Sequence, residues 1–274
     1  MDFNALVSVI IPIHNNEKTI ARALDSVLAQ TYQNFEIIVI DDCSQDNGPQ
    51  IVEEYIEKDK RISLIRNETN LKAAITRNVG INAAKGEYIA FLDGDDAYHP
   101  IKLEYDIGFL QDRPYFDLVS NQYHSMALYG KGNQDMANFV YKEASVKSML
   151  KKSSVFTSTV VMKSSIKERF SGEYPICEDL FYWVNILLAG HRIAVTNHIT
   201  SYYNNEYSNR LSLNFKLQHQ YEKKIVDYAY EHKAINGLEK CYLKCLYFLK
   251  FIRRPLKFKW LAHKEKRLQK KAGK

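Results

Sequence analysis

The chain has 274 residues, of which 46% are hydrophobic and 26% charged, so it is long enough to bury the core of one large globular domain. Glycine and proline are scarce, at 11 and 6 residues, which excludes a collagen-like or low-complexity chain. The net charge of +6 is unevenly spread. Residues 251–274 hold ten Lys or Arg and one acid, so this tail is +9 and residues 1–250 sum to −3. The tail therefore needs an explanation of its own.

The ends and the cysteines indicate a reduced, cytosolic setting. Met1 leads through an acid into an apolar run, without the basic region that begins a secretory signal. No stretch reaches the ~18 uninterrupted apolar residues of a membrane span. The cysteines show no CxxC spacing, and we expect reduced, buried thiols at Cys43, Cys177, Cys241 and Cys245. A metal held by Cys241 and Cys245, one helical turn apart, is the alternative.

Strand and helix patterns alternate through the first half of the chain. Short apolar runs predict buried strands at residues 7–13 and 35–40 and two further strands at 61–65 and 87–92. Between the first two, Ile20, Ala23 and Leu24 begin a helical apolar face, with Asn15 or Asn16 as its cap. Further helices are expected around residues 51–56 and 71–79. Such alternation predicts βαβ units and a mostly parallel sheet, which is an α/β fold.

Acidic residues follow two of these strands. Asp41 and Asp42 end the second, and Asp93, Asp95 and Asp96 follow the fourth. Ligands of parallel sheets bind beyond the carboxyl ends of the strands, so the two groups share one site if their strands are neighbours. Clustered carboxylates suit Mg²⁺ or Mn²⁺, which bind one or two carboxylates together with phosphate oxygens. A solvated acidic loop that caps the next helix is the alternative.

The second half is less regular. Residues 118–129, 153–163 and 192–196 are strand-like, and residues 178–190 form an amphipathic helix pattern that Gly190 ends. From about residue 213 the pattern is helical. Within residues 240–254 four of the basic side chains share one ~120° arc, and the other faces are rich in Tyr, Leu and Phe. The residues of this arc are Lys240, Lys244, Lys250 and Arg254.

Three stretches carry a resemblance to a known family. They are "VSVIIPIHNNEKTIARALDSVLAQTYQNFEIIVIDDCSQD", "TRNVGINAAKGEYIAFLDGDD" and "CEDLFYWVNIL". Together they resemble the family 2 inverting glycosyltransferases with the GT-A fold, over roughly residues 6–210, and their order makes this more specific than a lone DxD. The resemblance implies a GT-A domain at 1–210, with a nucleotide-binding half (about 1–120) and an acceptor half (about 121–210). A helical, basic extension at 211–274 follows.

The resemblance also implies roles for single residues. The positions expected to bind the nucleotide sugar are Pro12, His14, Asn15, Glu17, Asp41, Asp42, Arg77, Asp93, Gly94, Asp95 and Glu178. Asp41 would contact the edge of the nucleobase. Asp95 would bind Mn²⁺ or Mg²⁺ directly, with Asp93 beside it. For Arg77 a structural ion pair is an equal alternative.

Asp179 matches the catalytic base of the family. An inverting transfer needs one base for the proton of the acceptor hydroxyl and a stabilised diphosphate leaving group, which a metal provides. Without the resemblance, helix capping would explain both Glu178 and Asp179. A loop at 202–212 would reach the diphosphate through Arg210 or Ser212. His191 and His198 are weaker candidates for a further metal ligand.

The expected activity is the transfer of one sugar from a UDP-sugar to a lipopolysaccharide, lipooligosaccharide or capsule acceptor. A processive synthase would carry QxxRW and membrane spans, and this sequence shows neither. Two other classes remain open. A nucleotidyltransferase would need a Gly-rich phosphate loop, whereas "PIHNNEKT" has no glycine, and a non-catalytic module would bind nucleotide sugar without consuming it. The absence of GxGxxG after the first strand disfavours a dehydrogenase.

The basic tail fits the cytoplasmic face of a membrane. Each Lys or Arg near an anionic surface contributes about 1 kcal/mol, and Phe248, Phe251, Phe258 and Trp260 are interleaved with the charges. Nucleic-acid binding is the rival explanation, which these aromatic residues disfavour, and a solvated tail is a third. We expect a cytoplasmic protein, peripheral at the inner membrane face, with no nucleic-acid partner. The sequence does not predict an oligomeric state.

Overall fold

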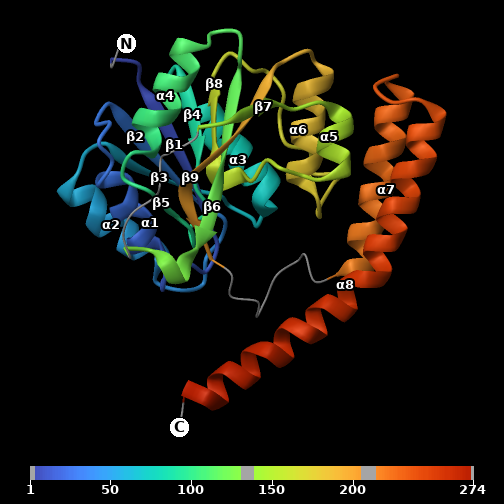
Figure 1. Cartoon of the computed structure of the whole chain (residues 1–274). Coiled ribbons are helices and arrows are strands. Elements are labelled where there is room, and N and C mark those ends of the chain that lie inside the picture. Colours follow the sequence, from blue (N-terminus) through green and yellow to red (C-terminus); the bar gives the residue numbers. More distant parts are fainter. Residues whose placement is uncertain (1–3, 131–138, 205–213, 273–274) are drawn as a thin grey trace. The chain divides into compact units, whose positions relative to one another are not determined.

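The structure is a computed structural model that describes residues 4–130, 139–204 and 214–272, with side chains up to residue 254 (Figure 1). The chain divides into two compact units, Met1–Glu206 and Tyr207–Lys274, which are described separately.

The first half of unit one is a parallel βαβ array. Its strands are β1 (Val7–Ile13), β2 (Phe35–Asp41), β3 (Ile62–Arg66) and β4 (Tyr88–Phe91), in the order β3-β2-β1-β4. Its helices are α1 (Ile20–Leu28), α2 (Gly48–Lys58) and α3 (Lys72–Ala83). The predicted α/β fold is thus confirmed. The expected cap of α1 is wrong, because the N-cap is Thr19 and no side chain caps the helix. The backbone carbonyl of Asn16 accepts the N–H groups of Thr19 and Ile20 in the turn before it.

Alternation along β1 assigns the helices to opposite faces of the sheet. Val9 and Ile11 join a buried core with residues of α1, α2 and α4 (Lys102–Asp112). Ile10 points the other way, since a Cβ at Gly80 of α3 would lie 2.4 Å from its Cγ2. Successive side chains of a strand point to opposite faces, so this buried run needs helices on both.

The second half of unit one extends the same sheet. Its strands are β5 (Ala97–Tyr98), β6 (Leu118–Ser125), β7 (Tyr141–Glu143), β8 (Val160–Lys163) and β9 (Ile193–Tyr203). The order continues β4-β8-β6-β9-β5, and β7 pairs with β9. Strands β8, β5 and β7 run against the others, so the sheet is mostly parallel. The other helices are α5 (Val146–Lys151), α6 (Glu178–Leu188), η1 (Met126–Leu128) and η2 (Thr157–Thr159).

Three predicted strands have other bounds in the structure. The run at 153–163 forms η2 before β8, and the run at 118–129 ends in η1. The short strand expected at 192–196 is the start of β9, which continues to Tyr203 because it pairs along β6 and then with β5. Long-range pairing, which local sequence does not encode, sets these ends.

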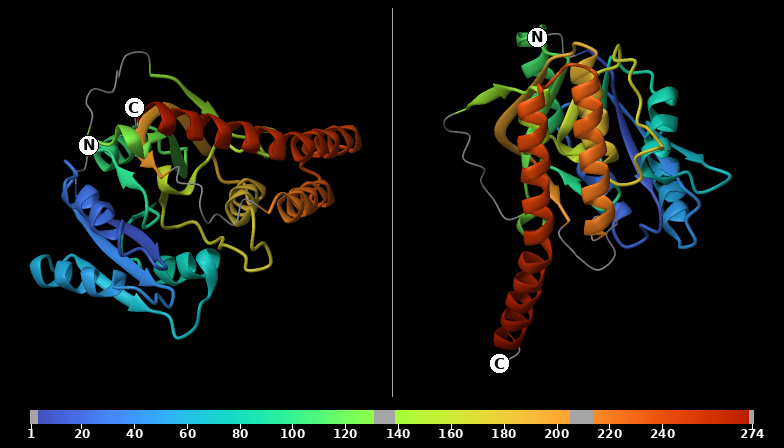
Figure 2. Two further views of the ribbon diagram at one scale, coloured as in Figure 1. Left: turned by 90° about the horizontal axis from the view of Figure 1, so that it is seen from below. Right: turned by 90° about the vertical axis from the view of Figure 1, so that its right-hand side faces the viewer.

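Unit two is a pair of packed helices, α7 (Phe215–Glu231) and α8 (Gly237–Ala272), which lie side by side (Figure 2). No helix in the described part of the chain is both long and apolar enough to cross a membrane. Cys241 and Cys245 are exposed, and Cys43 and Cys177 are half-buried. The expectation of buried thiols is therefore wrong, and for Cys241 and Cys245 the reason is that they occupy the face of α8 turned away from α7.

Candidate active site

The predicted site residues gather at one edge of the sheet. The sequence made a shared site conditional on the two acid-bearing strands being neighbours. In the structure β1 lies between β2 and β4. All three strands end at the same edge, since Asp41 is in register with Ile13 and the Leu92 N–H donates to the Ile10 carbonyl at 3.0 Å. The chain leaves β1 on one side and returns on the other as β4, and open α/β sheets bind ligands at such a switch point.

The segment after β1 is tied to the segment after β2. The Nδ1 of His14 lies 2.7 Å from the Asp42 carbonyl oxygen, and the Oδ1 of Asn15 accepts the Gln45 N–H at 2.8 Å. Glu17 Oε2 accepts the Asn47 N–H at 3.2 Å. Pro12 is half-buried within β1, while His14 and Asn15 are exposed. The polar residues of this segment therefore fix the two loops together and leave His14 and Asn15 accessible to a ligand.

Asp41 and Asp42 are both buried but differ in their bonds. Both oxygens of Asp42 are used, because they accept the N–H groups of Leu71 and Lys72 at 2.7 and 2.9 Å and the Asn67 amide at 2.9 Å. Asp42 thus shapes the chain before α3. Asp41 Oδ1 accepts the Ser44 N–H at 3.0 Å. This leaves Asp41 with more accepting capacity than Asp42 for a nucleoside.

The acid turn, residues 93–96, is held by its most buried member. Asp96 is 1% exposed, and its carboxylate accepts Ser158 Oγ–H at 2.6 Å and the Asn204 N–H at 2.9 Å. Burial, with Asp93 and Asp95 nearby, raises the pKa of Asp96 well above its ordinary value. Asp93 and Asp95 are half-buried. Asp96 therefore stabilises the turn through its bonds to the protein, and Asp93 and Asp95 are the carboxylates that a ligand can reach.

Gly94 lets the acid turn approach the end of β1. A Cβ at this position would lie 2.9 Å from Ile13 Cγ2 and 3.1 Å from Asn16 Cγ. Real Cβ atoms essentially never approach other atoms under 3.0 Å, so only glycine fits without a shift of the Ile13 side chain. The absence of a side chain here brings the metal-binding candidates against the loop that holds His14.

Arg77 joins three separate elements through its buried guanidinium. It is 5% exposed, and it pairs with Asp93 at 2.7 Å and with Glu178 at 3.4 Å. Its guanidinium also lies 5.5 Å from the centre of the Phe170 ring. Burial alone would lower the pKa of Arg77, but the Asp93 and Glu178 carboxylates, with Asp179, hold it above its ordinary value. The structural ion pair is thus present, and it links α3, the acid turn and α6.

Glu178 and Asp179 form the first turn of α6, after Cys177 in a left-handed conformation with φ 67°. Burial and the Asp179 carboxylate raise the pKa of Glu178 to about 7, although Arg77 opposes the rise. Burial, with Asp93 nearby, also raises the pKa of Asp179, while the Leu180 N–H at 2.6 Å and Arg77 oppose it. A carboxylate with a raised pKa is a stronger proton acceptor, as a general base requires.

The donor set suits a divalent cation that shares its coordination with a ligand. Among the residues that the structure describes, no three His, Cys, Asp or Glu side chains are grouped to hold a metal. Asp93 and Asp95 offer two carboxylates, and Mg²⁺ in proteins commonly uses one or two together with substrate phosphate oxygens. The two residues therefore fit the predicted cation.

The other polar candidates lie elsewhere. His191 contacts Asp117 at 3.5 Å and Glu168 at 3.1 Å, and His198 stacks on Tyr105 with 4.3 Å between ring centres. Neither belongs to the acid turn. Arg210 and Ser212 lie outside the described residues. A cavity of about 390 Å³ in the second half of unit one is lined by none of the predicted site residues, and Lys142, Lys152 and Asn197 are among those that line it.

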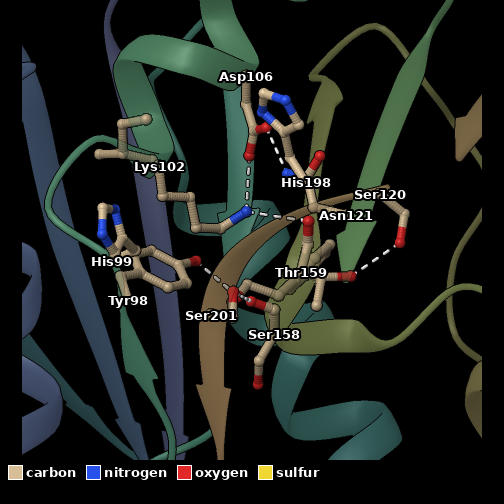
Figure 3. Close-up of polar contacts among 12 residues, drawn as sticks. Tyr98, His99, Lys102, Asp106, Ser120, Asn121, Ser158, Thr159, His198 and Ser201 are labelled. Carbon is tan, nitrogen blue, oxygen red and sulfur yellow. Dashed lines mark hydrogen bonds and ion pairs between the residues drawn. The ribbon is translucent and has the colours of Figure 1, made fainter. Parts of the chain in front are cut away.

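Sequence reasoning missed Ser158, which connects the acid turn to the interior. Figure 3 shows the interior side of this connection, where Ser158 lies beside Thr159 and Ser201. Its Oγ accepts the Asp93 N–H at 3.1 Å while donating to Asp96, and its carbonyl accepts Ser201 Oγ–H at 2.8 Å. The next residue, Thr159, accepts a bond from a fully buried Lys102, which pairs with Asp106 at 2.6 Å. The available signal was a run of hydroxyl residues inside an apolar stretch, "SSVFTSTVVMK".

Replacing Ser158 with alanine is expected to weaken both the fold and Mn²⁺ binding. Hydrogen bonds to charged groups contribute about 2 kcal/mol, so urea unfolding should show a loss of that size. Residues that orient metal ligands typically change metal affinity 10–100-fold, and we expect about tenfold by Mn²⁺ titration. Ser165→Ala, at an exposed position, is the control. Unchanged Mn²⁺ affinity in Ser158→Ala would show that this bond does not position the acid turn.

Comparison with known proteins agrees with this geometry. The family model described as "Glycosyl transferase family 2" matches residues 8–170. A glucosyltransferase of Escherichia coli, "UDP-Glc:alpha-D-GlcNAc-diphosphoundecaprenol beta-1,3-glucosyltransferase WfaP", is 36% identical over 198 residues, which are 72% of this chain and 76% of that one. A second of the same description, WfgD from the same organism, is 36% identical over 66% of this chain and 70% of its own length.

Solved structures share the fold. TarS 1–349 of S. aureus in complex with UDP-GlcNAc has a TM-score of 0.68 and 23% identity, over 92% of this chain and 73% of that one. The mannosyltransferase PcManGT of Pyrobaculum calidifontis, in complex with GDP-Man and Mn²⁺, has a TM-score of 0.65 and 17% identity. The match covers 89% of this chain and 73% of that one. The fold is therefore of the GT-A type. The family-model match and the E. coli relatives define the protein as a glycosyltransferase. The chain belongs to glycosyltransferase family 2.

Proposed function

We propose that this enzyme moves one sugar from a UDP-sugar to a lipid-linked glycan, with inversion at the anomeric carbon. The acceptor would belong to a lipopolysaccharide, lipooligosaccharide or capsule, at the cytoplasmic face of the membrane. The observation that carries the proposal is the convergence of the acid turn, Arg77 and the first turn of α6 at the switch-point edge of the sheet. The E. coli relatives, described as acting on UDP-Glc and a diphosphoundecaprenol-linked sugar, support the donor and acceptor classes.

Asp179 is the base in this proposal. The acceptor hydroxyl oxygen attacks the anomeric carbon, the bond from that carbon to the diphosphate oxygen breaks, and the nucleoside diphosphate leaves with the electron pair. The hydroxyl proton passes to the Asp179 carboxylate, whose raised pKa favours its uptake. Arg77 opposes the mutual repulsion of Asp93, Glu178 and Asp179, which keeps them close together. One displacement in line gives inversion.

The donor would lie along the carboxyl ends of β1, β2 and β4. Asp41 would accept a hydrogen bond from the nucleobase of the donor, with His14 and Asn15 beside it. Gly94 would allow the donor to approach closely. Asp95 and Asp93 would hold Mn²⁺ or Mg²⁺, which when bound stabilises the charge on the departing diphosphate. Asp42, Glu17 and Glu178 would act by shaping the loops and the local charge, because their carboxylates bond to the protein itself.

Sugar transfer to a lipid-linked acceptor tests the proposal. Radiolabelled UDP-glucose and UDP-GlcNAc would be supplied in parallel, with polyprenyl-diphosphate-linked sugars as acceptors and with either Mn²⁺ or EDTA. We expect label in the lipid fraction with Mn²⁺ only, and an inverted anomeric signal in the product by NMR. Transfer that EDTA leaves unchanged would contradict the metal assignment. A retained configuration would contradict the single displacement.

A further inference from the structure

α8 carries an exposed apolar face. Seven residues recur at intervals of three or four and are all exposed, so they form one stripe, the α8 apolar stripe. They are Leu238, Cys241, Tyr242, Cys245, Phe248, Leu249 and Ile252. Leu238 is 84% exposed, Phe248 53% and Ile252 48%. At 1.5 Å per residue the stripe is ~21 Å long.

The opposite face of α8 packs on α7, and it contains the basic arc found in the sequence. Leu243 and Tyr247 are buried. Lys240 and Lys244 pair with Asp227 of α7 at 2.8 and 2.7 Å. Arg254, at the end of the arc, likewise pairs with Glu222 of α7 at 2.6 Å. Three charges of the arc thus pair with acids of the neighbouring helix, while the side chains of the α8 apolar stripe face outward. A contiguous exposed patch of this kind marks an interaction surface.

The charge of α8 selects the occupant of this surface. Between Gly237 and Ala272 the helix has twelve Lys or Arg and two acids, a net charge of +10. A second copy would bring an equal positive charge against the first. An anionic bilayer offers both an apolar layer for the stripe and negative headgroups for the basic residues, and interfacial helices are recognised by this combination.

We propose that the α8 apolar stripe inserts into the interfacial layer of an anionic bilayer. In this proposal Lys240 and Lys244 remain paired with Asp227 of α7. The charge for the headgroups then comes from residues 255–272, which hold seven Lys or Arg and one acid. This rests on the proposed function in one respect: a lipid-linked acceptor gives the enzyme a reason to remain at the membrane. The stripe, rather than charge alone, makes the contact.

Vesicle flotation of the full chain tests the stripe. Vesicles of phosphatidylglycerol with phosphatidylcholine would be compared with phosphatidylcholine alone, without donor sugar. Leu249→Ser with Ile252→Ser should weaken partition to the anionic vesicles at least tenfold. The matched control is Leu128→Ser with Val140→Ser, which removes similar side chains that are 45% and 51% exposed in unit one and should partition like the wild type. Equal partition of both double variants would overturn the proposal.

A label in the stripe keeps the test independent of any variant's folding. In a chain whose only cysteine is Cys245, a polarity-sensitive fluorophore should shift to the blue on anionic vesicles and be quenched by lipids that carry a quencher in their chains. The same label on Lys223→Cys, at an exposed position of α7, should show neither effect. The label could instead be shielded before vesicles are added, and light scattering could show a doubled mass. That result would assign the stripe to a second copy of the chain and overturn the membrane proposal. Vesicle binding and nucleotide binding are measured separately, so either can fail alone.

Discussion

Replacing Asp179 with asparagine is expected to lower kcat for sugar transfer at least ~100-fold, because a positioned general base contributes about 10²–10⁴-fold. The amide oxygen can still accept the Leu180 N–H that Asp179 accepts at 2.6 Å, so the start of α6 should be kept. Donor binding should be unchanged, since Asp179 is proposed to act on the acceptor. The measurements are kcat for transfer and the Kd of UDP with Mn²⁺.

The control is Asp112→Asn, at an exposed position on α4, which should transfer sugar like the wild type. The wild type should also lose activity as the pH falls, because the base must be ionised. Since the pKa of Asp179 is raised, this loss should begin above the ordinary range of an aspartate. Turnover at the wild-type rate in Asp179→Asn would remove Asp179 from the mechanism.

Replacing Arg77 with methionine is expected to lower the free energy of unfolding by about 3 kcal/mol at pH 8. Methionine keeps contact with Phe170 but leaves three carboxylates without their shared cation. Removing one partner of a buried pair costs about 3–5 kcal/mol, and the lower end applies because Asp93 and Glu178 keep 31% and 24% of their side-chain exposure. Urea unfolding at two pH values measures this.

The loss should shrink at pH 5. Glu178 has a pKa of about 7 beside Arg77, and without the cation it would bind a proton more readily still, so acid relieves the repulsion in the variant. Arg66→Met is the matched control, because Arg66 pairs with Glu53 at 2.8 Å with both side chains 52% exposed, and exposed pairs contribute under about 1 kcal/mol. An equal loss at both pH values, or one no larger than the control's, would contradict this role for Arg77.

The sequence predicts the first half of the fold well because buried parallel strands have a local signature. The runs at β1 and β2 are apolar and β-branched, and the acids at the ends of β2 and β4 need only the topology to bring them to one edge of the sheet. Ser158 is different, because 65 positions separate it from Asp93 and nothing local indicates the bond. The helical arc of Lys240 and Lys244 was visible in the sequence, but whether it faced solvent or α7 depended on Asp227 across the helix pair.

The measurement that tests the central claim most directly is thermal stability with a panel of nucleotides and nucleotide sugars, each with Mn²⁺ and with EDTA. A ligand that binds only the folded state raises the melting temperature by mass action. At 100 times its Kd it adds about 2.7 kcal/mol to the free energy of unfolding. We predict a rise with UDP and with one UDP-sugar that EDTA abolishes and that Asp95→Asn loses. A folded chain whose melting temperature no nucleotide changes, with or without Mn²⁺, would contradict a nucleotide-sugar site at this edge of the sheet.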